Sequence, residues 1–117
     1  FEVWGGEQLR DFNFVEDVID ALLVAAMDPK ADGNVFNLGS REVVSLRELA
    51  ELLIEVNDGQ GSYVIREFPA ERKRIDIGDY YGDFSRMAAL GWNPKTALRE
   101  GLRKTVDYYR EHLEHYV

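Results

Sequence analysis

Short strand-like segments alternate with helical segments along all 117 residues of this chain. Runs of apolar, aromatic and β-branched residues bounded by Gly, Pro or Asp predict strands. They occur at 12–15, 34–38 and 62–68, with a short extended piece at 75–77. Helices are predicted over 16–27, from Ser45 through Ile54, over 85–90 and from Thr96 onward. Alternation of this kind favours an α/β fold with a small mixed sheet and several helices.

The clearest helix start is Ser45, because Glu48 follows it at the spacing of a capping box. Gly91 stands where a left-handed residue usually closes a helix. Trp92 is interpreted as a packing residue, and Asp17 as a helix cap in preference to a catalytic acid. No internal repeat or linker divides residues 1–117, so we expect one domain.

Composition and charge exclude several classes of protein. No stretch approaches the roughly 20 apolar residues of a membrane span. A formal net charge of -8 argues against a general nucleic-acid binder. The chain has no cysteine, which excludes disulfides and thiolate metal sites, and its two histidines argue against a zinc centre. We therefore expect no metal, no nucleic acid and no membrane among its partners.

The motifs of nucleotide-dependent enzymes are absent. There is no Gly-x-Gly-x-x-Gly loop, no Walker sequence, and no tyrosine followed four residues later by lysine. Three or four short strands cannot build the long doubly wound sheet that binds a whole dinucleotide. No catalytic residue and no cofactor-binding residue is therefore predicted within the chain.

Positive charge gathers at Arg72, Lys73 and Arg74, and Asp76 follows closely. Clustered basic side chains can hold a diphosphate through charge-assisted hydrogen bonds, and a nearby carboxylate can accept bonds from a sugar hydroxyl. The alternative is a solvated loop that balances local acids, and composition alone favours it. Arg10, just before a predicted strand, could point into a cleft or pair with Glu7 or Asp11 on the surface.

Several segments, in order, resemble the extended short-chain dehydrogenases/reductases, the family of NAD-dependent nucleotide-sugar epimerases and dehydratases. Residues 6–18 are similar to its Gly-x-Gln-x-Arg-Asp-Phe/Tyr-x-x-Val-x-Asp-Val segment, and 34–39 to its Phe-Asn-Leu/Ile-Gly strand. Residues 83–87, 90–94 and 98–102 are similar to its Asp-x-Ser-Lys-x, Leu-Gly-Trp-x-Pro and Leu-x-x-Gly-Leu series.

The resemblance is to the C-terminal substrate domain of these Rossmann-type enzymes, and implies that their N-terminal dinucleotide-binding domain is absent from residues 1–117. It implies that Arg10 and a base among Arg72, Lys73 and Arg74 bind the diphosphate of a nucleotide sugar. Asp76, with Asp79 second, would bind the ribose. The family pattern Arg-x-Gly-Asp is not kept here, which leaves open which base meets the phosphate.

For a parent protein the resemblance implies UDP-hexose 4-epimerisation, UDP-glucose being the expected substrate. NAD would take a hydride from the sugar and return it, while a tyrosine of the absent domain moves a proton. A 4,6-dehydratase or decarboxylase is the alternative within the family, and a stand-alone binding module the alternative outside it. We expect a cytoplasmic, homodimeric parent, and no turnover by residues 1–117 alone.

Overall fold

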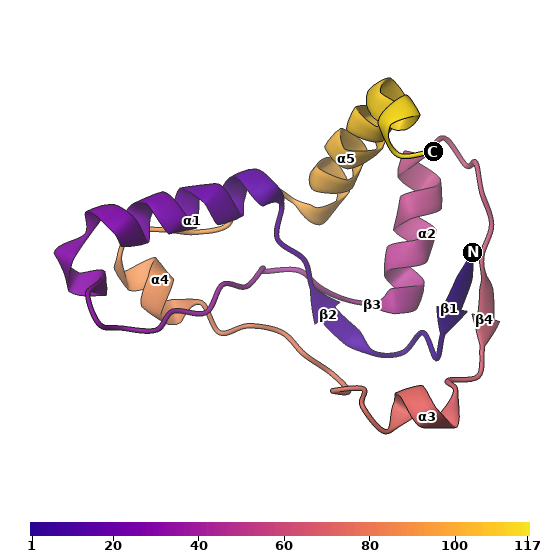
Figure 1. The fold of residues 1–117 in the computed structure, drawn as a ribbon, viewed down its shortest axis with the longest axis horizontal. Coiled ribbons are helices and arrows are strands. Elements are labelled where there is room, and N and C mark those ends of the chain that lie inside the picture. The colour runs from indigo at the N-terminus through magenta and orange to yellow at the C-terminus, as the bar shows by residue number, and fades with distance from the viewer.

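The computed structural model describes all residues from 1 to 117, in an elongated molecule of about 47 × 38 × 24 Å (Figure 1). Its strands are β1 Glu2–Trp4, β2 Leu9–Asp11, β3 Val43–Ser45 and β4 Val64–Arg66. Its helices are α1 Val15–Met27, α2 Leu46–Val56, α3 Ala70–Lys73, α4 Ser85–Ala89 and α5 Leu98–His112, with 3₁₀ turns at Pro29–Ala31 and Leu113–His115. None of the helices has the length and apolar content that a membrane crossing needs.

The strands form two separate two-stranded sheets. β1 pairs in parallel with β4, with Val3 opposite Ile65, and β2 pairs antiparallel with β3. The predicted α/β class is confirmed. The prediction of a single mixed sheet is wrong, because the parallel pair and the antiparallel pair form separate sheets. Gly5 and Gly6 lie between β1 and β2 with φ of 75° and 94°. These left-handed angles, which glycine adopts without strain, turn the chain between the two sheets.

Two predicted strands differ from the structure. The strand predicted at 12–15 lies too far along the sequence. The strand of this region is β2, which ends at Asp11, and α1 already begins at Val15. Phe14 instead packs against Gly101 of α5, with the Lys104 ammonium 5.1 Å from its ring centre. The segment 34–38 belongs to no strand. The extended piece at 75–77 is also absent, since residues 74 and 75 form a turn after the unpredicted α3.

The helix signals are confirmed. Ser45 Oγ accepts from the Glu48 N–H at 3.1 Å, and Glu48 Oε2 accepts from the Ser45 N–H at 2.7 Å. The second bond lowers the pKa of Glu48, because it favours the charged carboxylate. Gly91 has φ 93° after α4, as expected. α5 begins two residues later than predicted, at Leu98, whose N–H donates to Glu42 Oε1.

Removing the Ser45 cap should destabilise the chain measurably. Replacing Ser45 by Ala leaves the Glu48 N–H without its acceptor, and the expected cost in free energy of unfolding is about 1 kcal/mol. Urea unfolding followed by circular dichroism measures it. The matched control is Ser62→Ala, whose exposed hydroxyl makes no hydrogen bond and caps no helix. Equal effects of the two substitutions would contradict the capping role.

The main core lies between α1 and α4. Ala21, Met87 and Trp92 are fully buried there, with Phe84 edge-on to the indole at 5.9 Å. Trp92 is thus a packing residue, as predicted. Asp17 is buried, but its role is not that of a helix cap. Its Oδ2 accepts from the backbone N–H groups of Lys95 and Thr96 at 3.2 and 2.9 Å, which ties α1 to the segment before α5.

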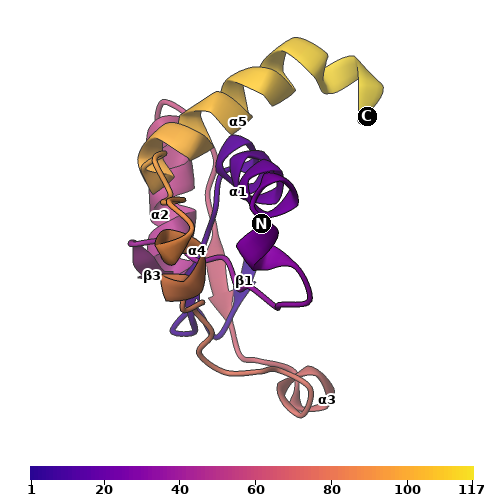
Figure 2. The same cartoon turned by 90° about the vertical axis from the view of Figure 1, so that its left-hand side faces the viewer.

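α5 also packs on α2, so the molecule has two helical regions joined by the β2–β3 pair (Figures 1 and 2). β1 lies beside α2, with β4 on its outer side (Figure 1), and α3 lies at the end of the molecule away from α5 (Figure 2). This arrangement brings the turn after β1, the strand β2 and the loop after α3 together at one end.

Candidate substrate-binding site

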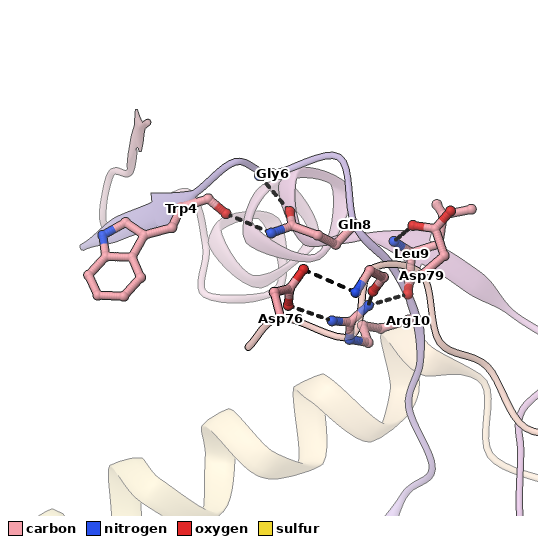
Figure 3. A network of polar contacts seen from close by, with 8 residues as sticks. Trp4, Gly6, Gln8, Leu9, Arg10, Asp76 and Asp79 are labelled. Carbon is pink, nitrogen blue, oxygen red and sulfur yellow. Dashed lines mark hydrogen bonds and ion pairs between the residues drawn. The ribbon is translucent and has the colours of Figure 1, made fainter. Parts of the chain in front are cut away.

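Arg10 is held where β2 meets the loop after α3. Its Nη1 donates to the carbonyl oxygens of Leu9, at 2.7 Å, and of Gly78, and its Nη2 lies 3.4 Å from Asp76 Oδ1 (Figure 3). The side chains of Arg10 and Asp76 keep 20% and 22% of their exposure. The structure therefore brings together two of the predicted site residues, although they are 66 positions apart in the chain.

The loop is also tied to β2 through the backbone. The Tyr80 N–H donates to the Leu9 carbonyl at 3.0 Å. The Leu9 N–H donates to Asp79 Oδ1 at 2.9 Å (Figure 3). Asp76 Oδ2 accepts from the Gly78 N–H at 3.2 Å. One carboxylate oxygen of Asp79, the second candidate for binding the ribose, is thus occupied by a backbone N–H. Asp76 stays beside the arginine.

The surface pairing that was the alternative for Arg10 is not formed. Glu7 pairs with Arg47 at 2.7 Å. Asp11 Oδ2 accepts the backbone N–H groups of Ser40 and Gly82, at 2.9 and 3.1 Å. Asp11 therefore fastens the end of β2 to two distant segments, and the guanidinium beside it turns to the loop.

The three consecutive bases do not act as one cluster. Arg72 and Lys73 lie on α3 and Arg74 directly follows it, all three exposed. Arg72 places its guanidinium carbon 5.8 Å from the ring centre of Trp4, a cation–π distance. The side chains of Lys73 and Arg74 form no hydrogen bond and no ion pair with any residue, and both are exposed. The structure thus brings Arg72 to β1 and leaves the other two bases in solvent.

An apolar cavity of about 530 Å³ opens beside the Arg10–Asp76 pair. Trp4 and Phe68 line it from the ends of β1 and β4, with ring centres 6.1 Å apart, and Asp76 borders it. Leu46, Leu49 and Leu53 of α2 supply its apolar wall. Sequence reasoning missed β1 and both aromatic residues. The available signal was the β-branched and aromatic pair Val3-Trp4, followed directly by the strand-ending Gly5-Gly6.

Gln8 shapes the turn that carries β1 into β2. Its Nε2 donates to the Trp4 carbonyl at 3.1 Å, and its Oε1 accepts the Gly6 N–H at 2.9 Å (Figure 3). A Cβ on Gly5 would lie only 3.0 Å from the Gln8 amide. The Gly-x-Gln spacing therefore has a structural reason, because the Gln8 amide bonds to the backbone on both sides of the turn and packs closely on Gly5.

Nothing in this arrangement could hold a dinucleotide. That ligand needs a glycine-rich turn at the carboxyl edge of an open parallel sheet. Here the only two strands that pair in parallel are β1 and β4, of three residues each, and neither strand leads through a glycine-rich loop into a helix. No group of three His, Asp or Glu side chains is placed to hold a metal ion.

Comparisons with known proteins agree on one family. The family model described as "NAD dependent epimerase/dehydratase family" matches residues 1–39. GDP-L-fucose synthase 1 of Arabidopsis thaliana is 39% identical over 111 residues, which are 92% of this chain and 32% of that protein. The chain thus spans about a third of the length of the curated relatives that it matches.

Solved structures share the fold. UDP-glucose 4-epimerase of Thermotoga maritima, crystallised with UDP-glucose, superimposes with a TM-score of 0.82 at 32% identity, over 96% of this chain and 35% of that one. MoeE5 in complex with UDP-glucose and NAD gives a TM-score of 0.80 at 29% identity, over 97% and 37%. The matching family model, the curated relatives and these solved structures are thus nucleotide-sugar epimerases and dehydratases of the extended short-chain dehydrogenase/reductase type, and this chain is similar to about a third of the length of each relative.

Proposed function

We propose that residues 1–117 are the nucleotide-sugar-binding domain of an NAD-dependent epimerase, most simply a UDP-hexose 4-epimerase. The observation that carries this proposal is the Arg10–Asp76 pair beside an apolar, aromatic-lined cavity. The likeness to an epimerase crystallised with UDP-glucose supports the choice of UDP-hexose. A 4,6-dehydratase or decarboxylase that binds its nucleotide sugar in the same way is the second candidate, favoured by the dehydratases that the family includes.

Arg10 keeps donors for a phosphate. A guanidinium has five N–H donors in a fixed fork. Arg10 uses two on Nη1 for carbonyl oxygens and one on Nη2 for the long contact with Asp76. The Nε–H and the second Nη2–H remain for a diphosphate, which suits the bidentate geometry of this group. Arg72, which lies over Trp4, is the base of the three best placed to join it.

The cavity supplies the rest of the binding site in this proposal. A nucleobase stacks well on aromatic side chains, and Trp4 and Phe68 offer two such rings. Asp76 stands between the cavity and Arg10, which suits an acceptor for ribose hydroxyls situated between base and diphosphate. The order aromatic cavity, carboxylate, guanidinium thus follows the order base, ribose, phosphate.

The NAD of such an enzyme would be held by protein outside these residues. No residue of the chain fits that cofactor, so we assign none of them a part in hydride or proton transfer. Bound NAD would supply the redox step, while the residues described here would bind and orient the nucleotide sugar. We accordingly expect no turnover of UDP-glucose by residues 1–117, even with NAD added, and a homodimeric parent.

Titration with UDP-glucose tests the site. We expect weak binding with amide shifts at Arg10, Arg72 and Asp76 in ¹⁵N NMR spectra, because these residues would meet the ligand. Glucose 1-phosphate, which lacks the nucleoside, is the control and should shift fewer of these amides. Absence of shifts at millimolar UDP-glucose, or shifts confined to α1 and α5, would contradict the proposal.

A further inference from the structure

Two Asp-Gly steps occur in the chain, Asp32-Gly33 and Asp58-Gly59, and there is no Asn-Gly step. Among aspartyl sequences, Asp-Gly rearranges most readily through a cyclic imide, because glycine has no side chain to hinder its backbone nitrogen. Both steps lie in turns, and both glycines have left-handed φ angles, of 69° and 74°. The two steps are therefore equivalent in sequence and in glycine conformation, and they differ only in their contacts.

The groups that would react are free at the first step. Asp32 bonds through its backbone alone: its N–H donates to the Pro29 carbonyl and its carbonyl accepts from Asn34 Nδ2, each at 3.2 Å. Its carboxylate has no partner, and the Gly33 N–H donates to no acceptor. Both residues are exposed, and beyond the adjoining residues no atom lies within 4 Å of the place that a Cβ on Gly33 would take. Little therefore resists the rotation that brings the Gly33 nitrogen to the Asp32 side chain.

The same groups are held at the second step. The Gly59 N–H donates to the Ile54 carbonyl at 2.9 Å, in the turn that closes α2. Asp58 Oδ2 accepts from Arg110 Nη2 at 2.8 Å, so its carboxylate is directed to α5. Ring closure at Asp58 requires both contacts to break first, whereas ring closure at Asp32 breaks none of this kind.

We propose that Asp32 is a site of spontaneous isoaspartate formation in the folded protein, and that Asp58 is protected from it. The Gly33 nitrogen attacks Cγ of Asp32, and the proton of that nitrogen leaves with the carboxyl hydroxyl as water. Water then adds to the main-chain carbonyl carbon of Asp32 and breaks its bond to the Gly33 nitrogen. The main chain now runs through Cβ and Cγ, and the former main-chain carbonyl is a free carboxylate. No oxidant or cofactor is consumed.

The product differs from aspartate in two ways that matter to the fold. The main chain is one methylene longer at the end of the molecule beyond α1 (Figure 1), which should displace Asn34. Asn34 Oδ1 accepts from Arg86 Nη2 at 3.0 Å, so the link between this turn and α4 should weaken. The new carboxylate on the α-carbon is also a group that a carboxyl methyltransferase can esterify. The proposal does not depend on any ligand of the Arg10 site.

Peptide mapping of the aged protein tests the proposal. Residues 1–117 are held at neutral pH below their melting temperature and then digested with trypsin. Each of the two resulting peptides, 31–41 and 48–66, contains a single aspartate. An isoaspartyl peptide keeps the mass of its parent but elutes separately, and an isoaspartyl methyltransferase with labelled methyl donor counts it. We expect isoaspartate to form on the order of 10-fold faster in 31–41 than in 48–66, because contacts must break at Asp58.

Two controls separate structure from sequence. In urea-unfolded chain both peptides should convert at similar rates, because the contacts of Asp58 and Gly59 are then lost. Asp32→Glu keeps the charge but would have to close a larger ring, which forms far more slowly, so peptide 31–41 should stay unmodified. Equal rates in the folded chain, or faster conversion of Asp58, would overturn the proposal. So would an unmodified Asp32 in folded chain after the unfolded sample has converted.

Discussion

Replacing Trp92 by Ala should lower the free energy of unfolding by about 3–5 kcal/mol, the range for removing a buried aromatic side chain. Trp92 keeps 2% of its exposure and packs on Ala21 and Met87, with Phe84 edge-on at 5.9 Å. Its Nε1–H donates to the Asp17 carbonyl at 2.9 Å, so the substitution also removes a buried tertiary hydrogen bond. Urea unfolding followed by circular dichroism measures the loss.

The size of this core makes the effect severe. Only 12 of 117 residues are buried, and a domain of this size has a total stability of roughly 5–15 kcal/mol or less. A loss near the upper end of the expected range would leave much of the Trp92→Ala protein unfolded. The matched control is Trp4→Ala, because that indole is 37% exposed and lies in the other part of the molecule. Similar losses for both would show that the core is not centred on Trp92.

The parts of the fold that depend on neighbouring residues in the chain were predictable from the sequence. The Ser45–Glu48 cap, the glycine after α4 and the helices α1 and α2 follow from signals within a few residues of one another. Such signals act locally, so they do not need a tertiary partner. The helices α1, α2, α4 and α5 accordingly agree with the predicted ones within a few residues, whereas the short α3 was not predicted.

The strands were less predictable because a strand exists only through its partner. The paired residues of β2 and β3 are more than thirty positions apart in the sequence, and those of β1 and β4 about sixty. No local pattern reveals either pairing. The segment 34–38 has a strand's composition but finds no partner within this chain. Asp17 illustrates the same limit, since its two acceptor bonds reach Lys95 and Thr96.

The candidate site contains both residues that were predicted from the sequence and residues that were missed. Arg10 and Asp76 were predicted from the family resemblance, and the structure places them in contact. Composition could not indicate that two donors of Arg10 are used by carbonyl oxygens, because that depends on the path of the loop at Gly78. The aromatic pair Trp4 and Phe68 was missed, since it forms only when β1 and β4 align.

Replacing Arg10 by Ala should weaken UDP-glucose binding about 10- to 150-fold, the equivalent of about 1.5–3 kcal/mol for hydrogen bonds to a charged group. Arg10→Lys should recover part of the affinity, because it keeps the charge but not the two-pronged geometry. Isothermal titration of the complete protein gives the dissociation constants. The control is Arg47→Ala, which removes an exposed arginine paired with Glu7, and should leave binding unchanged.

Arg10 also anchors the loop through Gly78 and Asp76, so loss of affinity could arise from loop displacement alone. Uridine distinguishes the two causes, because it has the base and ribose of the ligand but no phosphate. If Arg10 meets the diphosphate, Arg10→Ala should weaken UDP-glucose binding much more than uridine binding. If it only holds the loop, both ligands should lose affinity by the same factor, since the Asp76 carboxylate and the cavity would be displaced for both. Equal losses would therefore remove Arg10 from the proposed diphosphate site.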